Sequence, residues 1–320
     1  MAKKKIAIIG ECMIELSGQP FSPMRQNYGG DTINTAIYLN MLSNSAIDTH
    51  YVTSMGADPL STAIVNKWQE HGVATDFVLT NPDKHAGLYM IQNDADGERT
   101  FQYWRNDSAA KYLIQHEKFM GVLDTINQFD AVYLSGISLA ILTEEDCHLL
   151  LGYIAKLKAN GVKFIYDSNY RPSLWSSKNH CVTANNKAYS MADLALVTFD
   201  DEALLWQDSH IEETRARLHK VGVTALVVKD GANGCQYSEL NHNNDIIVFK
   251  YSTQAVDQIV DTTAAGDSFN AGFLSQWLLG HSIEQSAHCG NALARQVIQQ
   301  QGAIVPIDKT LIVTALQISP

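Results

Sequence analysis

The sequence Asp261-Thr262-Thr263-Ala264-Ala265-Gly266-Asp267-Ser268-Phe269-Asn270-Ala271-Gly272 is the most informative part of this 320-residue chain. The apolar segment that follows has helical periodicity, so Ala264, Ala265 and Gly266 stand where a helix begins. A helix N-terminus carries unpaired backbone N–H groups and the positive end of the helix dipole, and small residues there let a phosphate come close. Asp267 could take a proton from a hydroxyl that attacks a phosphoryl group. This arrangement predicts phosphoryl transfer, although a loop entering a helix with an acidic first turn would explain Ala-Ala-Gly-Asp alone.

The composition is typical of a globular enzyme and argues against several other classes of protein. Hydrophobic residues make up 46% of the chain and charged residues 18%, and the formal net charge is −11. So negative a chain is not expected to bind nucleic acid or an anionic membrane surface. The five cysteines are scattered without a Cys-x-x-Cys pair, so we expect neither a disulfide framework nor a zinc site. The first apolar run is too short for a signal peptide and no run could span a bilayer, so we expect a cytoplasmic protein.

Short apolar strands alternate with helices along most of the chain. Strands are expected at residues 5–9, 50–54, 131–135, 163–167, 194–198 and 225–229. Helices are expected at residues 32–42, 60–71, 144–160, 182–191, 200–206 and 212–221. This alternation predicts one α/β domain over residues 1–320, a three-layer α/β/α sandwich with a mostly parallel central sheet. Two hairpin-like insertions, about residues 12–28 and 85–105, would form a small β-sheet lid.

A glycine-rich cluster follows the first lid insertion. Open α/β sheets bind their ligands beyond the carboxyl ends of strands, where such polar clusters lie. Gly29 and Gly30 would allow a ligand to approach the backbone, and Asp31 and Asn34 can bond sugar hydroxyls. A capped helix after a glycine turn would explain the same pattern.

The second lid insertion contains the aromatic sequence Phe-Gln-Tyr-Trp-Arg-Asn at residues 101–106. Period-2 alternation would place Tyr103 and Arg105 on one face of a strand, and Tyr89, on the partner strand, could join them. A guanidinium binds a carboxylate through two parallel hydrogen bonds, so an Arg beside two phenols predicts a carboxylate site. An exposed aromatic strand with a solvated Arg105 is the alternative.

Two further polar segments follow expected strands. Residues 166–175 read Tyr-Asp-Ser-Asn-Tyr-Arg-Pro-Ser-Leu-Trp, and their Arg171 offers local positive charge to an anion in a net-negative protein. Residues 229–234 read Lys-Asp-Gly-Ala-Asn-Gly, which by itself indicates a turn between hairpin strands. The Gly-Lys-Ser/Thr end of a Walker A loop is absent, so P-loop chemistry is not indicated.

These segments together resemble the signatures of the ribokinase-like (PfkB-type) carbohydrate kinase family. The run at 261–272 matches its C-terminal signature position by position, and residues 28–34 resemble its N-terminal Gly-Gly…Asn signature. The resemblance implies a ribokinase-like fold, with ATP and Mg²⁺ as cofactors. It also implies that Asp267 is the catalytic base and that the amides of residues 264–267 hold the charge of the transferred phosphoryl group. Relatives pair through their lid sheets, so a homo-oligomer through the lid is implied as well.

The resemblance implies roles for other residues. Arg171 would meet the substrate carboxylate or the transferring phosphate, and Asn169 would help to organise magnesium and phosphates. The nucleotide would be bordered by Thr198, Lys229, Gly231, Gly234, Ala264, Gly266 and Asn291. Glu202 would act on the magnesium shell through water. Asp261 and Thr263 match positions whose backbone binds a monovalent cation such as K⁺ in some relatives.

The sequence departs from the broader family pattern in two places. Asp31-Thr32 stands where the family has a small residue, and Phe199 stands where it often has Asn. The first departure and the Tyr-Trp-Arg-Asn at 103–106 resemble the branch that phosphorylates sugar acids, the 2-dehydro-3-deoxygluconate kinases. This implies ATP-dependent phosphorylation of a hexulosonic acid at its terminal (6-) hydroxyl. A neutral-sugar kinase such as fructokinase, in which Arg105 would be dispensable, and a catalytically silent sugar-binding relative are the alternatives.

Overall fold

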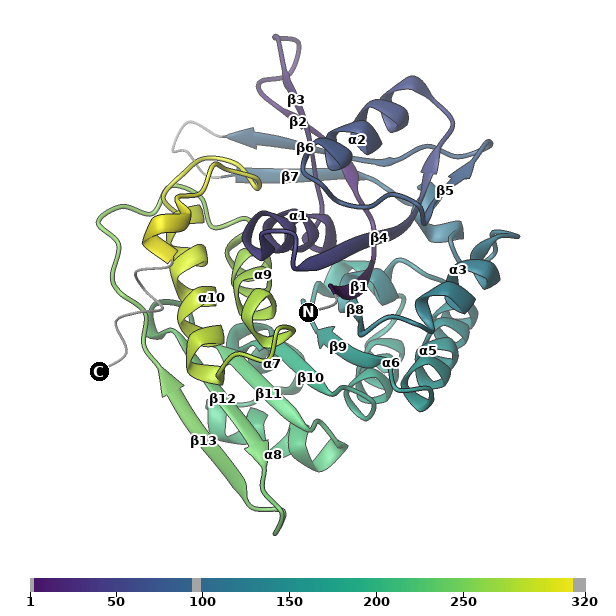
Figure 1. Cartoon of the computed structure of the whole chain (residues 1–320). Coiled ribbons are helices and arrows are strands. Elements are labelled where there is room, and N and C mark those ends of the chain that lie inside the picture. Colours follow the sequence, from purple (N-terminus) through teal and green to yellow (C-terminus); the bar gives the residue numbers. More distant parts are fainter. Residues whose placement is uncertain (1–2, 94–98, 313–320) are drawn as a thin grey trace.

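The computed structural model describes residues 3–93 and 99–312, and a nine-stranded sheet runs through its centre (Figure 1). The strand order is β13-β12-β11-β10-β9-β8-β1-β4-β5, and every pair from β11 to β5 is parallel. The parallel strands are β1 (Lys4–Ile9), β4 (Ile47–Gly56), β5 (Val78–Asn81), β8 (Ala131–Ser135), β9 (Lys163–Asp167), β10 (Leu194–Thr198) and β11 (Ala225–Lys229). Two antiparallel strands complete one edge, β12 (Cys235–Leu240) and β13 (Ile246–Tyr251). The carboxyl ends of the parallel strands therefore meet at one side of the sheet.

Helices cover both faces of this sheet (Figure 1). One face carries α1 (Asp31–Ser43), α2 (Pro59–Glu70), α9 (Ala265–Trp277) and α10 (Ile283–Val297). The other carries α3 (Phe119–Ile126), α4 (Gly136–Ala140), α5 (Glu144–Ala159), α6 (Lys178–Tyr189), α7 (Phe199–Trp206) and α8 (Ile211–Val221). Along β1, Ile6 and Ile8 are buried in the first core, and Ala7 and Ile9 in the second. Because both faces are buried, the strands need successive apolar residues, which explains their short apolar runs.

A separate four-stranded sheet, which we call the lid sheet, lies at the top of Figure 1. Its order is β3-β2-β6-β7, formed by β2 (Met13–Ser17), β3 (Arg25–Gly29), β6 (Gly87–Asn93) and β7 (Arg99–Trp104). The central strands β2 and β6 are parallel, and both outer pairs are antiparallel. The register places Tyr89 between Glu15 on β2 and Tyr103 on β7, so these three side chains share one face.

The predicted fold class is confirmed, and most element bounds agree within a few residues. The four strands expected between residues 131 and 229 have the predicted bounds. The helix expected at 182–191 begins earlier, at Lys178, because Ser177 Oγ accepts a hydrogen bond from the His180 amide and caps it. In the part of the chain that the structure describes, no helix is long and apolar enough to cross a membrane.

Candidate active site

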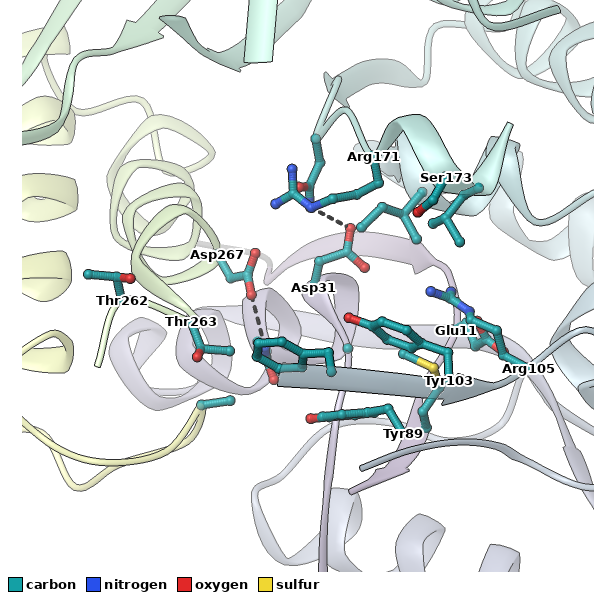
Figure 2. Close-up of a pocket in the computed structure, with 18 of the residues that line it drawn as sticks. Glu11, Asp31, Tyr89, Tyr103, Arg105, Arg171, Ser173, Thr262, Thr263 and Asp267 are labelled. Atoms are coloured by element: carbon teal, nitrogen blue, oxygen red, sulfur yellow. Dashed lines mark hydrogen bonds and ion pairs between the residues drawn. The ribbon is translucent and has the colours of Figure 1, made fainter. Parts of the chain in front are cut away.

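Two cavities meet at the N-terminus of α9. The first has a volume of about 610 Å³ and extends beneath the lid sheet (Figure 2). The second has a volume of about 320 Å³ and lies beside the ends of β10 and β11. Thr262 lines both cavities, Asp267 lines the first, and Ala265 and Gly266 line the second. The first turn of α9 therefore forms part of the wall between them, and within the described chain no side chain caps its N-terminus at Ala264.

Asp267 points into the first cavity from the first turn of α9 (Figure 2). It is 8% exposed, and its Oδ2 accepts a hydrogen bond of 2.8 Å from Asn34 Nδ2. Burial, and then the negative charge of Asp31, raise the pKa of Asp267 from 3.8 to about 8, against the opposing effects of Asn34 and Lys229. A carboxyl group with a pKa of about 8 holds its proton up to that pH, and once ionised it is a stronger base than an ordinary carboxylate.

Asp31 is a second buried carboxylate on the same cavity, at the start of α1. Its Oδ2 accepts hydrogen bonds from Ser135 Oγ and from Asn169 Nδ2, the latter at 2.9 Å. Burial raises the pKa of Asp31 above the usual range of a carboxyl group, and the bond from Ser135 acts against this. Asn169 reaches Asp31 from a backbone with a φ of 32°, in the left-handed region that Asn tolerates.

Asp167, at the end of β9, pairs with a buried cation, Lys229. Its Oδ2 accepts hydrogen bonds from Asn270 Nδ2 at 2.6 Å and from Lys229 Nζ at 3.3 Å. Lys229 also donates to Asn270 Oδ1 at 3.1 Å, and its Nζ lies 3.6 Å from the point where a Cβ on Gly266 would stand. The Lys229 ammonium is therefore beside the positive end of the α9 dipole, and an anion bound there would be stabilised by both.

The lid contributes an arginine and two tyrosines to the first cavity. Arg105 follows β7, is 8% exposed, and donates through Nη2 to Glu11 Oε2 (Figure 2). Tyr89 donates its hydroxyl hydrogen to Glu15 Oε2 at 2.5 Å, and burial holds its pKa well above the usual value for tyrosine. Tyr89 has one proton to donate, so towards a ligand it can act only as an acceptor while this bond persists. The Tyr103 ring lies 6.0 Å from the Tyr89 ring.

Arg171 stands at the rim of the same cavity. Its side chain is half-exposed, and its Nη1 lies 3.2 Å from Asp201 Oδ1. An exposed pair of this kind is held weakly, so the Arg171 guanidinium can exchange Asp201 for an anion in the cavity more readily than buried Arg105 can leave Glu11.

The second cavity is lined mainly by small and apolar residues. Its polar side chains are those of Lys229, Arg295, Asn291 and Gln254 and of the threonines Thr198, Thr253 and Thr262. The turn between β11 and β12 borders it through Gly231 and Gly234, with φ angles of 50° and 88° that favour glycine. Such a surface suits a flat, partly apolar ligand with an anionic end directed towards Lys229 and α9.

Comparison with known proteins gives the same family over the whole fold. Residues 3–310 match the model of the pfkB family carbohydrate kinases. The chain belongs to the pfkB family. It is 47% identical to the 2-dehydro-3-deoxygluconokinase of Haemophilus influenzae, over 97% of each chain. It is 43% identical to the 2-dehydro-3-deoxygluconokinase of Dickeya dadantii, over 96% of this chain and 99% of that one.

Solved structures show the same fold. A protein from Escherichia coli named ribokinase II, solved in complex with ATP and Mg²⁺, superposes with a TM-score of 0.81 at 21% identity. The match covers 98% of this chain and 99% of that one. At this identity the likeness concerns the fold, and it confirms the ribokinase-like architecture.

In this pfkB-family chain, most of the residues singled out in the sequence lie on the two cavities. The first cavity brings together Gly30, Asp31, Asn34, Tyr89, Tyr103, Arg105, Asn169, Arg171, Asp261, Thr263 and Asp267. The second brings together Thr198, Lys229, Gly231, Gly234, Ala265, Gly266 and Asn291. Arg171, expected to meet either the substrate carboxylate or the transferring phosphate, lies on the first cavity. Asn169, expected to help to organise magnesium and phosphates, lies on the first cavity as well.

Three predicted residues line neither cavity. Gly29 ends β3, where a Cβ would stand 2.6 Å from the Tyr89 hydroxyl. The side chain of Ala264 is in the core, and this residue contributes through the backbone that begins α9. Glu202 is fully buried; it accepts hydrogen bonds from Tyr189 at 2.5 Å and from Arg217 at 2.8 Å. The structure therefore turns the Glu202 carboxylate into the protein interior, away from the site where it was expected to act on magnesium.

Sequence reasoning missed Glu11, Thr262 and Asp201 as residues of the site. Glu11 follows β1 and Asp201 follows β10, so each stands at the carboxyl end of a parallel strand. That position could have indicated both residues from the sequence, because open α/β sheets bind their ligands beyond the carboxyl ends of strands. Their partners Arg105 and Arg171 come from other segments, and no local pattern indicates these pairs.

Proposed function

We propose that this protein transfers a phosphoryl group from ATP to the terminal (6-) hydroxyl of 2-dehydro-3-deoxygluconate. The observation that carries the proposal is the position of Asp267, on a first turn of α9 that separates a cavity with two arginines from a cavity with glycines and Lys229. Relatives of 43% and 47% identity that carry the name 2-dehydro-3-deoxygluconokinase support the choice of sugar acid.

The residues of the first cavity would position the acceptor. Arg105 and Arg171 would bind the carboxylate, and Asp31 and Asn34 would bond the hydroxyls of the sugar chain. Asp267 would accept the proton of the terminal hydroxyl as its oxygen bonds to the γ-phosphorus and the bond to ADP breaks. The lid sheet would exclude water, which limits wasteful hydrolysis of ATP.

The second cavity fits the phosphoryl donor. Its apolar lining and glycine turn suit a purine, and Asn291 and Thr198 offer polar contacts at its edge. The amides at residues 264–267 and the Lys229 ammonium would hold the phosphate charge. Among the described residues, no three His, Cys, Asp or Glu side chains converge to hold a metal. Mg²⁺ would accordingly arrive with the triphosphate and be held largely by its oxygens, the usual arrangement for this ion.

A monovalent cation such as K⁺ is part of the proposal, near Asp261 and Thr263. Asp261 Oδ1 accepts bonds from the Thr263 amide at 3.0 Å and its hydroxyl at 2.6 Å, and Oδ2 accepts from the Gly302 amide at 2.9 Å. This side chain ties together two loops whose carbonyl oxygens would be the ligands. Turnover in potassium buffer should exceed turnover in tetramethylammonium buffer. Equal rates in the two buffers would contradict a role for a monovalent cation.

Self-association through the lid sheet is also proposed. β7 is an edge strand, and Trp104 on its outer face is 55% exposed. Light scattering should give a mass above 35.4 kDa that Trp104→Lys lowers to the monomer value. A monomeric wild-type protein would contradict this part of the proposal.

Turnover with three acceptors tests the function itself. Purified protein with MgATP should phosphorylate 2-dehydro-3-deoxygluconate far better than fructose or ribose, and phosphorus NMR should place the phosphate on the terminal carbon. Fructose turnover equal to that of the sugar acid would favour the neutral-sugar kinase. Binding of a sugar without any turnover would favour the silent relative.

A further inference from the structure

We propose that Glu11 is a positioning residue, which holds the Arg105 guanidinium in the orientation that binds the substrate carboxylate. This inference rests on the proposed function, because it concerns how a sugar acid is recognised. It assigns a task to a buried carboxylate that takes no part in the phosphoryl transfer described above.

The pair joins the two parts of the molecule that enclose the first cavity. Glu11 follows β1 of the central sheet, and Arg105 follows β7 of the lid sheet. The two residues are 94 positions apart in the chain, and they are 2% and 8% exposed. A long arginine side chain has many rotamers, and a buried charged partner selects one of them. Glu11 therefore determines where the guanidinium lies relative to the cavity.

The hydrogen bonding of the pair is incomplete in the free protein. Glu11 Oε1 and Arg105 Nε are both buried, and neither has a hydrogen-bond partner within the described chain. Both residues line the first cavity. Buried donors and acceptors are normally satisfied, so an unpaired donor beside an unpaired acceptor at a cavity wall suits a ligand that offers a carboxylate oxygen to Arg105 and a hydroxyl to Glu11. The sugar acid carries such a hydroxyl beside its carboxylate in the cyclic hemiketal form, in which the C2 carbonyl has become a C2 hydroxyl.

Gly87 provides an independent sign that this geometry matters. A Cβ on Gly87 would stand 2.8 Å from Glu11 Oε1, 3.0 Å from Met13 Cγ and 3.1 Å from Arg105 Cβ. The φ of Gly87 is not in the left-handed region, so backbone conformation does not require glycine there. The missing side chain instead makes room for the pair, and even a methyl group would have to displace it.

Positioning and simple charge neutralisation predict opposite results. Glu11 is negative, so if its only effect were electrostatic, its removal would strengthen the binding of an anion. If Glu11 positions Arg105, its removal weakens binding, because the guanidinium then loses its fixed orientation. Gln at position 11 keeps the oxygen that accepts from Arg105, so it should preserve the orientation without the charge.

Titration calorimetry with 2-dehydro-3-deoxygluconate in the absence of ATP tests this. Glu11→Ala and Gly87→Ala should each weaken binding about tenfold, as expected for loss of a charge-assisted contact, and Glu11→Gln should stay within about threefold of the wild type. ATP affinity should be unchanged in all three variants. Gln102→Ala, on the exposed outer face of β7, is the matched control and should bind like the wild type.

Several results would overturn the positioning role. These are wild-type affinity in Glu11→Ala and Gly87→Ala, a parallel loss of ATP affinity, tighter binding in Glu11→Ala, or a Glu11→Gln variant as weak as Glu11→Ala. If Glu11→Ala does not fold, Gly87→Ala still decides, since it removes no charged group. A wild type that binds the sugar acid without phosphorylating it would contradict the proposed function alone.

Discussion

The two cavities beside α9 are lined by different kinds of residue. The first is lined by charged and aromatic side chains that several distant segments bring together, with Asp31, Asp267 and Arg105 all buried. The second is lined by apolar side chains and by the backbone of glycine turns, with Lys229 at its inner end. Selection in the first cavity should therefore depend on charge, and selection in the second on shape and backbone access. The first turn of α9 belongs to both, so changes there separate the two kinds of recognition.

The largest effect is expected at Asp267, where the first cavity performs its chemistry. Asp267→Asn keeps the bulk of the side chain and removes the proton acceptor, so kcat should fall roughly 10³-fold. ATP affinity should change little, because Asp267 does not line the second cavity. Steady-state kinetics with a coupled ADP assay measure kcat, and a binding titration measures the affinity for ATP. Asp200→Asn, in the exposed first turn of α7, is the control and should keep the wild-type kcat. A comparable loss in Asp200→Asn, or retained activity in Asp267→Asn, would contradict the assignment of Asp267 as the base.

The next effect tests whether charge decides selection in the first cavity. Arg105→Met should lower kcat/KM for the sugar acid about 100-fold, because a charge-assisted hydrogen bond in a desolvated site is lost. Turnover of a neutral sugar should not fall with it. Arg25→Met, an exposed arginine on β3 of the same lid sheet, should leave both unchanged. Since Arg105→Met leaves Glu11 buried without its partner, the double variant with Glu11→Gln should be measured alongside to separate folding from binding.

Features that depend on one segment could be predicted from the sequence. The first turn of α9 is an example, because its small residues and Asp267 indicate an anion site by themselves, without knowledge of any other part of the chain. The four central strands are another, because a strand buried on both faces must be an apolar run. The lid sheet followed from a different local pattern, the two hairpin-like insertions at about residues 12–28 and 85–105.

Features that depend on contacts between distant segments could not be predicted from the sequence. Glu202 was assigned to the magnesium shell from the resemblance to the family, but such a resemblance does not say which face of α7 is buried in this chain. Tyr189 from α6 and Arg217 from α8 decide that its carboxylate points inward. The Glu11–Arg105 pair has the same origin, since it exists only once the lid sheet lies over β1.

A smaller effect is expected on the nucleotide side, at Gly266. Apart from the backbone of α9 itself, Lys229 Nζ at 3.6 Å is the only described atom within 4 Å of the point where a Gly266 Cβ would stand, so alanine fits the free protein. A methyl group there would occupy the approach of the phosphates, and KM for ATP should rise about tenfold. Stability should rise by about 0.5–1 kcal/mol, as for other Gly→Ala changes in helices. Gly152→Ala in α5, where a Cβ would meet no described atom within 4 Å apart from the backbone of α5 itself, should give the same gain in stability without a change in the KM for ATP. An unchanged KM in Gly266→Ala would show that the phosphates bind elsewhere.

The smallest effect concerns the pH dependence of stability. The Asp267 pKa is 3.8 in an exposed chain and about 8 in the folded protein. Between these values the folded state holds a proton that the unfolded state has lost, so raising the pH through this window destabilises the folded state, by at most about 1.4 kcal/mol per pH unit. Below pH 3.8 Asp267 is protonated in both the folded and the unfolded state, so it no longer lowers the stability of the fold. Asp267→Asn removes this titration, so its melting temperature should exceed that of the wild type at pH 8 by about 2–4 °C or more, with a gap that narrows towards pH 5.

Asp130 supplies a control of opposite sign. Burial acts to raise its pKa, but hydrogen bonds from Lys4 and the Lys5 amide outweigh this and hold the pKa below the usual value. Its stabilising contribution is present above the unfolded pKa and is lost only as the pH falls below about 4. Asp130→Asn should therefore melt below the wild type by a constant margin between pH 5 and pH 8. If the margin for Asp267→Asn is also constant, Asp267 is ionised throughout this range, and the first cavity holds a charged carboxylate before any substrate binds.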